Sequence, residues 1–257
     1  MPNFSQYRQE IAAQASSFKI YIQSLIPFDK IQQLLVILEE QSDIYIFGGV
    51  IRNFLLGYPF HRDIDIVVCA KNNKILLPMK LLHGINISRN KFGGIKLILP
   101  HITIDIWKLS ETWGILKKEL SPTPYSLINT VFFNFSAIVF DYKQQRFIYG
   151  NDFLKFYKSR TMDIVFSHNP YPTACVISSC YYAQEYNFPI GKKLRQWISK
   201  QALEDDIESQ QMNRYNEIKF QESVIKAFVE ICKRVKNKNT SVCIHDINNH
   251  QYIFKFE

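Results

Sequence analysis

Hydrophobic and polar positions in the first half of the chain predict helices followed by the short strands of a sheet. Apolar residues at positions 31, 34, 35 and 38 have helical spacing, so we expect a helix over residues 28–41. Another helix is expected over residues 3–24, with Pro27 between the two. β-prone segments bounded by glycine, proline or polar residues come next. The expected strands are 44–47, 64–68, 95–99, 102–107, 136–142 and 146–149, with short helices at 52–56 and 75–82.

The pattern changes after Gly150, where apolar positions at helical spacing replace the short strands. Helices are expected over residues 171–185, 190–201 and 214–236, and a closing β-hairpin over 242–247 and 251–256. The sequence therefore predicts an α+β fold in two domains. Residues 1–150 would hold the sheet and the N-terminal helices, and residues 151–257 a mainly α-helical domain with the C-terminal hairpin.

Acidic residues interrupt two of the expected strands. Asp63 and Asp65 lie one residue apart, and the alternation of a strand points both side chains to one face. Asp105 lies in the strand 102–107, which follows residues 95–99 across a turn near Pro100. Carboxylates that close on one face repel each other unless a cation lies between them. The simplest purpose of this arrangement is to hold a divalent metal ion beside a phosphate group.

The residues around the first acidic strand carry a resemblance to a known family. Residues 48–57 read GGVIRNFLLG, and residues 63–65 read DID. This order and spacing resemble the head domain of class II tRNA nucleotidyltransferases (CCA-adding enzymes) and bacterial poly(A) polymerases, within the DNA-polymerase-β-like nucleotidyltransferase superfamily. The resemblance covers about residues 41–110. It implies a head built on a mixed sheet with flanking helices, followed by a helical neck-like domain.

The resemblance also implies a reaction and its metal ions. Such an enzyme transfers a nucleoside monophosphate from an NTP to the 3′ hydroxyl of RNA, with tRNA as the favoured acceptor, and releases pyrophosphate. Asp63, Asp65 and Asp105 would be the catalytic residues and would hold two Mg²⁺ ions. A solvated strand face that binds nothing is the alternative for Asp63 and Asp65, and a surface or helix-capping acid is the alternative for Asp105.

The glycine-rich run would supply the nucleotide contacts. Gly48 and Gly49 would let backbone N–H groups approach the triphosphate at a helix N-terminus, and Arg52 would pair with phosphate oxygens. Each residue also has a purely structural alternative. The glycines would then form a turn with positive φ, and Arg52 would form a salt bridge with an acidic side chain.

Several departures from the family pattern keep other functions open. Asn53 stands where the family has aspartate, and residues 130–137 and 169–175 have lost the charged residues of the family's next two motifs. The family's element that selects CTP and ATP has no clear counterpart. One alternative is therefore nucleotidyl transfer to a protein side chain or a small molecule. Another is a non-catalytic relative that binds nucleotide or RNA.

Composition narrows the class of protein further. The 257 residues carry a formal net charge of +8, which favours polyanionic partners such as RNA and nucleoside triphosphates. No apolar run reaches the length of a membrane span, and the N-terminus lacks a secretory pattern. The five cysteines show no Cys-x-x-Cys spacing, so neither a disulfide framework nor a zinc site is expected. A cytoplasmic protein fits these features best, and the sequence leaves its oligomeric state open.

Other residues near the site are weaker candidates. Lys96 is a possible phosphate guide with a solvated surface charge as its alternative, and Trp107 shares the expected face of Asp105 but is equally explained by packing. Arg62, Arg89 and Lys91 have the same two alternatives as Lys96. Phe92 is a candidate for stacking on a base, with a core aromatic as its alternative. His61 and His101 lie near the acids, but a hydroxyl activated by a metal ion needs no histidine base. The basic residues 233–238 suit either an RNA backbone or the dipole at the end of a helix.

Overall fold

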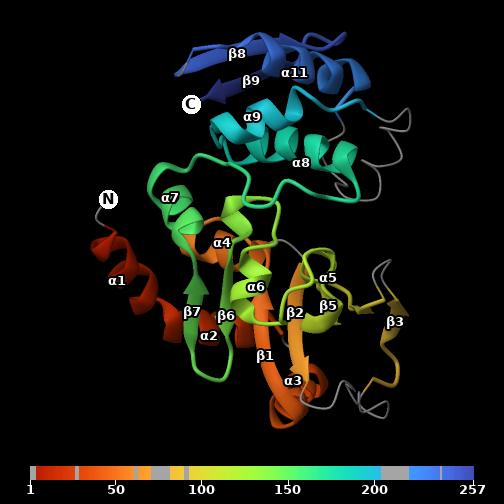
Figure 1. The fold of residues 1–257 in the computed structure, drawn as a ribbon. Helices are drawn as coiled ribbons and strands as arrows, with labels where there is room; N and C mark the ends of the chain where they lie inside the picture. The colour runs from red at the N-terminus through yellow and green to blue at the C-terminus, as the bar shows by residue number, and fades with distance from the viewer. Residues whose placement is uncertain are drawn as a thin grey trace. The chain divides into compact units, whose positions relative to one another are not determined.

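The chain forms two compact units in a computed structural model that describes residues 4–26, 29–60, 63–70, 82–89, 93–203, 220–237 and 239–257 (Figure 1). The first unit comprises Met1–Val131 and Phe135–Leu154, and the second comprises Phe132–Asn134 and Lys155–Glu257. The domain assignment as a head over residues 1–150 and a neck-like domain over 151–257 stays a prediction. The compact units differ from it because the short segment 132–134 groups with the second unit.

A seven-stranded mixed sheet forms the centre of the first unit, with the order β3-β4-β5-β2-β1-β6-β7. Strands β2 and β5 run parallel, and the other neighbouring pairs in this sheet are antiparallel. The strand bounds are β1 Ser42–Phe47, β2 Asp63–Ala70, β3 Asn86–Arg89, β4 Ile95–Ile98, β5 Thr103–Lys108, β6 Ile138–Asp141 and β7 Arg146–Tyr149. The mixed sheet expected from the sequence is therefore confirmed, with β3 as an additional strand.

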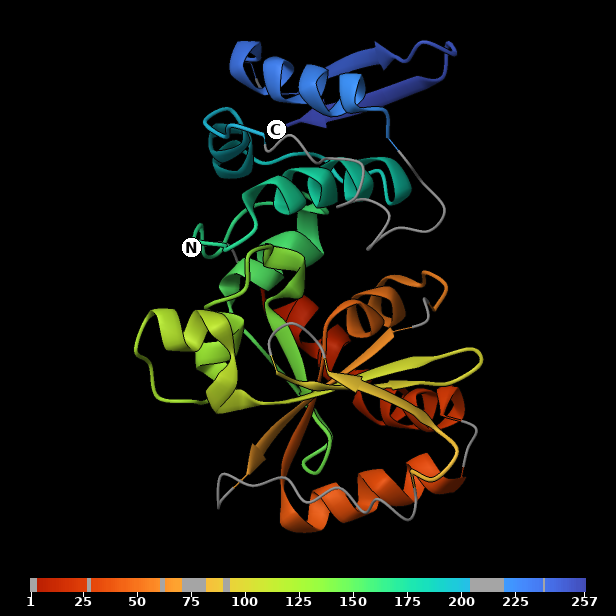
Figure 2. The same cartoon turned by 90° about the vertical axis from the view of Figure 1, so that its right-hand side faces the viewer.

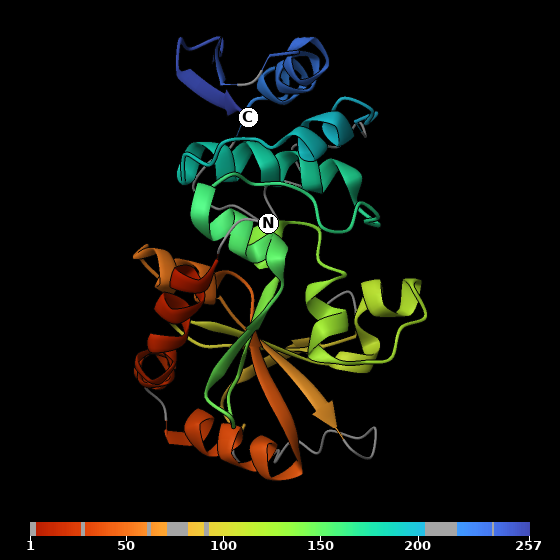
Figure 3. The same ribbon diagram turned by 60° about the vertical axis from the view of Figure 1, so that its left-hand side comes forward.

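Helices flank both sides of this sheet, with α1 and α2 on one side and α5 and α6 on the other (Figure 3). Their bounds are α1 Ser5–Ala13, α2 Ala15–Leu25, α3 Asp29–Gln41, α4 Gly49–Leu56, α5 Trp113–Lys117 and α6 Pro124–Ile128, with 3₁₀ turns at Leu109–Glu111 and Asn134–Ser136. The single helix expected over residues 3–24 is wrong, because the backbone turns at Gln14 and starts a new helix there. Residues 75–81 of another expected helix lie outside the described residues.

An aromatic cluster fills the face of the sheet that α2 and α4 cover. The ring of Phe18 in α2 lies 5.1 Å from that of Phe54 in α4, 4.8 Å from that of Phe140 in β6 and 5.3 Å from that of Phe147 in β7. Phe140 is paired in register with Ile46 of β1, which is fully buried on the same face. Because strand side chains alternate, the apolar packing of this face leaves the opposite face for Phe47 and Asp65.

Helices dominate the second unit, which also contains the closing hairpin (Figure 2). The bounds are α7 Asn151–Ser159, whose first residues belong to the first unit, α8 Pro172–Glu185, α9 Lys192–Ile198, α11 Glu222–Arg234, β8 Thr240–His245 and β9 Gln251–Phe256. The expected start of α9 at residue 190 is wrong, because Ile190 forms a β-bridge with Phe256 instead. Among the described helices, none is long and apolar enough to cross a membrane.

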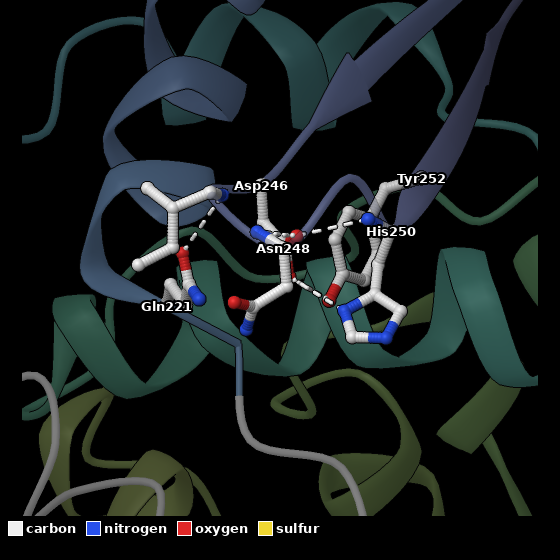
Figure 4. A network of polar contacts seen from close by, with 6 residues as sticks. Gln221, Asp246, Asn248, His250 and Tyr252 are labelled. Carbon is white, nitrogen blue, oxygen red and sulfur yellow. Dashed lines mark hydrogen bonds and ion pairs between the residues drawn. The ribbon is translucent and has the colours of Figure 1, made fainter.

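A network of polar contacts closes the turn between β8 and β9 (Figure 4). The Asp246 carboxylate accepts hydrogen bonds from the backbone N–H groups of Asn248 and His250, at 2.8 Å and 2.9 Å. Its second oxygen lies 3.0 Å from Nδ1 of His250 and 3.3 Å from the Tyr252 hydroxyl. Burial of Asp246 opposes its charge, but the hydrogen bonds from His250 and Asn248 outweigh it and lower its pKa. This carboxylate therefore fixes the hairpin expected from the sequence.

Candidate active site

The acidic side chains meet where β2 and β5 run side by side. Asp65 is paired in register with Asp105, and Asp63 is paired with Thr103. Paired residues on adjacent strands project to the same face, so all three carboxylates lie on one face of the sheet. Asp63 is exposed, whereas Asp65 and Asp105 are partly buried. The structure thus brings together the acids that the sequence separates by some forty residues.

Gly48 brings the start of α4 against Asp65. It has a φ of +84°, a conformation that side-chain-bearing residues rarely adopt. A Cβ atom at this position would overlap the Asp65 carboxylate, so glycine is required by the close approach as well as by the backbone angle. The preceding residue, Phe47, is paired in register with Asp65. The N-terminus of α4 and the carboxylate are therefore held together by sheet pairing and by the absence of a side chain.

The pKa of Asp65 is raised by its surroundings. Burial, then the charge of Asp105 and then that of Asp63, raises its pKa to about 7, and Lys96 only partly offsets this rise. A raised carboxylate pKa means that the ionised form is unfavourable in this environment. A cation beside the three acids would relieve that repulsion.

Lys96 of β4 lies directly across from Asp105 in the antiparallel β4–β5 pair. Its Nζ atom lies 2.5 Å from Oδ2 of Asp105, and the side chains retain 32% and 15% of their exposure. The sequence pattern alone presents Lys96 only as a basic residue near the site. Its position opposite Asp105 was accessible in principle, because the short turn at residues 100–101 fixes the register of the hairpin.

Arg52 and Asn53 form a buried pair within α4. The Arg52 guanidinium donates through Nε and Nη2 to Oδ1 of Asn53, at 3.0 Å and 2.8 Å, and lies 5.2 Å from the Phe135 ring centre. The amide nitrogen of Asn53 donates to the Pro59 carbonyl at 2.8 Å. Asparagine therefore keeps the acceptor for Arg52 that the family's aspartate would supply and adds a donor. A role for Arg52 toward phosphate stays a prediction.

The weaker candidates from the sequence have different surroundings in the structure. Trp107 packs edge-on against Phe47, with ring centres 6.0 Å apart, and its indole N–H donates to the Thr112 hydroxyl at 3.2 Å. These contacts account for Trp107 by packing on the acidic face. Arg89 and His101 are exposed. The remaining candidates lie outside the described residues, namely His61, Arg62, Lys91 and Phe92.

The chemistry of the acidic face suits a hard divalent cation. Mg²⁺ prefers oxygen ligands, and proteins commonly bind it through one or two carboxylates together with water and substrate phosphates. Asp63 and Asp65 provide such carboxylates, and the repulsion felt by Asp65 is what a cation would remove. Within the described part of the chain, no group of three His, Cys, Asp or Glu residues is arranged to hold a metal ion. Metal binding by Asp63, Asp65 and Asp105 together therefore stays a prediction, and a site on Asp63 and Asp65 would take its remaining ligands from water or substrate.

Helix α8 carries no charged residue in its first turns, where the sequence resemblance implies the arginines of a family neck. Nine residues of α8 are buried, and Pro172 and Cys175 stand where the resemblance would place the two arginines. In the basic segment 233–238, Lys233 is paired with Glu230 at 2.5 Å. The buried residues of α8 serve helix packing, and the Lys233–Glu230 pair is an ion pair within the last turns of a helix. A contact of the basic segment with RNA stays a prediction.

Comparisons with known proteins agree on the fold. No protein-family model and no curated protein sequence matches the chain. Among solved structures, a tRNA-processing enzyme with CTP is 18% identical with a TM-score of 0.54, over 77% of this chain and 54% of that chain. An apo form of a tRNA-processing enzyme matches at 18% identity and a TM-score of 0.50, covering 78% of this chain and 61% of that chain.

A further match is a tRNA nucleotidyltransferase complexed with a primer tRNA and an incoming ATP analogue, at 19% identity and a TM-score of 0.49. It covers 65% of this chain and 48% of that chain, so the chain spans about half the length of the first structures it matches. At these identities the likeness concerns the fold. The chain has the fold of tRNA-processing nucleotidyltransferases, as the sequence resemblance implied.

Proposed function

We propose that this chain is a metal-dependent nucleotidyltransferase that moves a nucleoside monophosphate from an NTP to the 3′ hydroxyl of RNA, with tRNA as the favoured acceptor. The observation that carries the proposal is the convergence of Asp63, Asp65 and Asp105 on one sheet face, with the N-terminus of α4 held against Asp65 by Gly48. The fold favours the same reaction, because a structure that shares it is a tRNA-processing enzyme with CTP.

In this reaction the 3′ oxygen bonds to the α-phosphorus, the bond from that phosphorus to the bridging oxygen breaks, pyrophosphate leaves, and the hydroxyl proton passes to water. Bound Mg²⁺ would polarise the α-phosphate and lower the pKa of the attacking hydroxyl. Asp63 and Asp65 would hold the ion, and the backbone N–H groups at the start of α4 would point toward the triphosphate. The two aspartates would thereby position the ion, and the backbone N–H groups would orient the triphosphate and offset its negative charge.

The test is incubation of the full chain with each α-labelled NTP, Mg²⁺ and total RNA, followed by separation of the RNA, protein and small-molecule fractions. Label in RNA supports the proposal, and sequencing of the labelled 3′ ends identifies the acceptor. Asp63→Asn with Asp65→Asn should abolish the label. Asp43→Asn is the matched control, because Asp43 is an exposed aspartate at the other end of the neighbouring β1, where it is paired with Cys69 instead of an acid. Equal label in both variants would overturn the assignment of the site.

The second candidate acceptor is a protein side chain or a small molecule. It is favoured by α8, where buried small and apolar residues replace the arginines of the family's neck. The same experiment separates the two acceptors, because this one predicts label in the protein or small-molecule fraction with none in RNA. Absence of transfer under Mg²⁺ and Mn²⁺ would instead leave a nucleotide-binding relative without activity.

A further inference from the structure

Asp65, Asp105 and Lys96 form a continuous row across three neighbouring strands. Asp65 of β2 is in register with Asp105 of β5, and Asp105 is in register with Lys96 of β4. The ammonium group of Lys96 lies 2.5 Å from Oδ2 of Asp105, in a pair that is largely shielded from water. The protein therefore places a cation of its own at one end of the row of acids.

Resting on the proposed function, we propose that the Lys96 ammonium takes the place of one of the two metal ions, so that the site holds a single divalent cation on Asp63 and Asp65. The geometry supports this division. Asp105 has an ammonium donor at hydrogen-bond distance, whereas Asp65 has Asp105 in register beside it and Asp63 two residues away on the same face. A divalent ion is therefore needed beside Asp65, and Asp105 already has a cation.

Formal charge leads to the same count. The three carboxylates and the Lys96 ammonium together carry a charge of −2, which one divalent ion neutralises. A second divalent ion close to Asp105 would face the ammonium group, and like charges at such short range oppose binding. Removal of the ammonium would reverse the preference and open Asp105 to a second ion.

The test is metal stoichiometry, measured on the full chain by Mn²⁺ titration with electron paramagnetic resonance. Wild type should bind one Mn²⁺ at the site, and Asp63→Asn with Asp65→Asn should lose it. An equimolar mixture of the four α,β-methylene NTP analogues is then added. Wild type should keep the spectrum of isolated Mn²⁺, because metal ions about 4 Å apart, as in two-metal sites, would give a coupled spectrum.

Lys96→Met should show the coupled spectrum and a second Mn²⁺, whereas Lys96→Arg should remain like wild type. Lys108→Met is the matched control. It removes the same charge from β5, where Lys108 is paired with Glu111 at 2.7 Å, away from the row. Circular dichroism checks that the variants fold.

A coupled pair in wild type would overturn the single-ion site while leaving the transferase intact. An unchanged stoichiometry in a folded Lys96→Met variant would overturn the role of Lys96. No Mn²⁺ bound by wild type, together with no transfer activity, would overturn the proposed function itself.

Discussion

Two shielded aspartates of this chain, Asp65 in the sheet of the first unit and Asp246 in the hairpin of the second, have opposite surroundings. Asp246 accepts hydrogen bonds from two backbone N–H groups and has His250 and Tyr252 at its second oxygen, and its pKa is lowered. Asp65 lies beside two other carboxylates and its pKa rises to about 7. One environment favours the ionised form and the other opposes it.

The difference distinguishes a carboxylate that stabilises the fold from one that is available for chemistry. Donors surround Asp246, so its charge is neutralised by the protein alone. The charge of Asp65 is balanced only when a further cation arrives, and this imbalance is typical of metal and catalytic sites. Substitution by asparagine should therefore change stability in opposite directions at Asp65 and at Asp246.

The largest expected effect is that of Asp65→Asn on transfer activity. Loss of a charged metal ligand should remove about 4 kcal/mol of transition-state stabilisation, equivalent to about a thousandfold fall in kcat/KM. The same variant should stabilise the metal-free protein above pH 7. Asp65 binds its proton more tightly in the folded protein than in the unfolded chain. The wild-type protein therefore loses stability as the pH rises from the unfolded pKa of Asp65, near 4, to the folded pKa of about 7.

That loss amounts to at most about 4 kcal/mol, because one pKa unit corresponds to about 1.4 kcal/mol. Urea unfolding of the metal-free protein from pH 4 to pH 8 measures it, and Mg²⁺ should reverse it in wild type but not in Asp65→Asn. If Asp65→Asn kept the same dependence of stability on pH, the loss of stability would come from a group other than Asp65.

The next effect concerns the glycine that allows Asp65 its close neighbour. Gly48→Ala places a Cβ against the Asp65 carboxylate at a φ of +84°, and we expect a loss of about 3 kcal/mol of stability with at least a tenfold fall in activity. Gly57→Ala is the matched control, because Gly57 has a φ of +71° but nothing within 4 Å of an added Cβ. It should cost about 1 kcal/mol. Equal losses of stability in the two variants would mean that only the backbone angle matters.

Part of the acidic face could be predicted from the sequence, because that part depends on local pattern. Alternation along a strand fixes the shared face of Asp63 and Asp65, and the turn after residue 99 fixes Asp105 on the second strand of a hairpin. The parallel pairing of β2 with β5 joins strands that are distant in sequence, and no local pattern encodes it. Only that pairing establishes that Asp105 lies beside Asp65.

Other features escaped prediction for physical reasons of their own. All four residues of β3 are exposed, so the strand lacks the alternation of apolar and polar positions that reveals a half-buried strand. The break at Gln14 involves neither proline nor glycine. Ile190 is extended because it forms a β-bridge with Phe256, which is distant in sequence. This tertiary contact outweighs the local tendency toward helix.

A smaller effect is expected from Asn53→Asp, which restores the residue typical of the family. The carboxylate keeps the bonds from Arg52 but loses the donor to the Pro59 carbonyl, so stability should fall by about 1 kcal/mol. Asn134→Asp is the control, because Asn134 also donates to a carbonyl but accepts from the backbone N–H of Asp163 where Asn53 accepts from a guanidinium. It should cost more, up to about 3 kcal/mol. A stabilising Asn53→Asp would mean that the charge pair with Arg52 outweighs the lost donor.

The smallest effect completes the comparison at the hairpin. Asp246 has a lowered pKa when folded, so its contribution to stability is present above the unfolded value near 4 and is lost as pH falls below it. Asp246→Asn keeps an oxygen for the backbone N–H groups of Asn248 and His250 but removes the charge that holds the His250 ring. Hydrogen exchange at those two amides should accelerate at pH 6 in the variant and only at acidic pH in wild type. Transfer activity should stay at the wild-type level, and a fall like that of Asp65→Asn would give Asp246 a part in the chemistry and remove the contrast between the two aspartates.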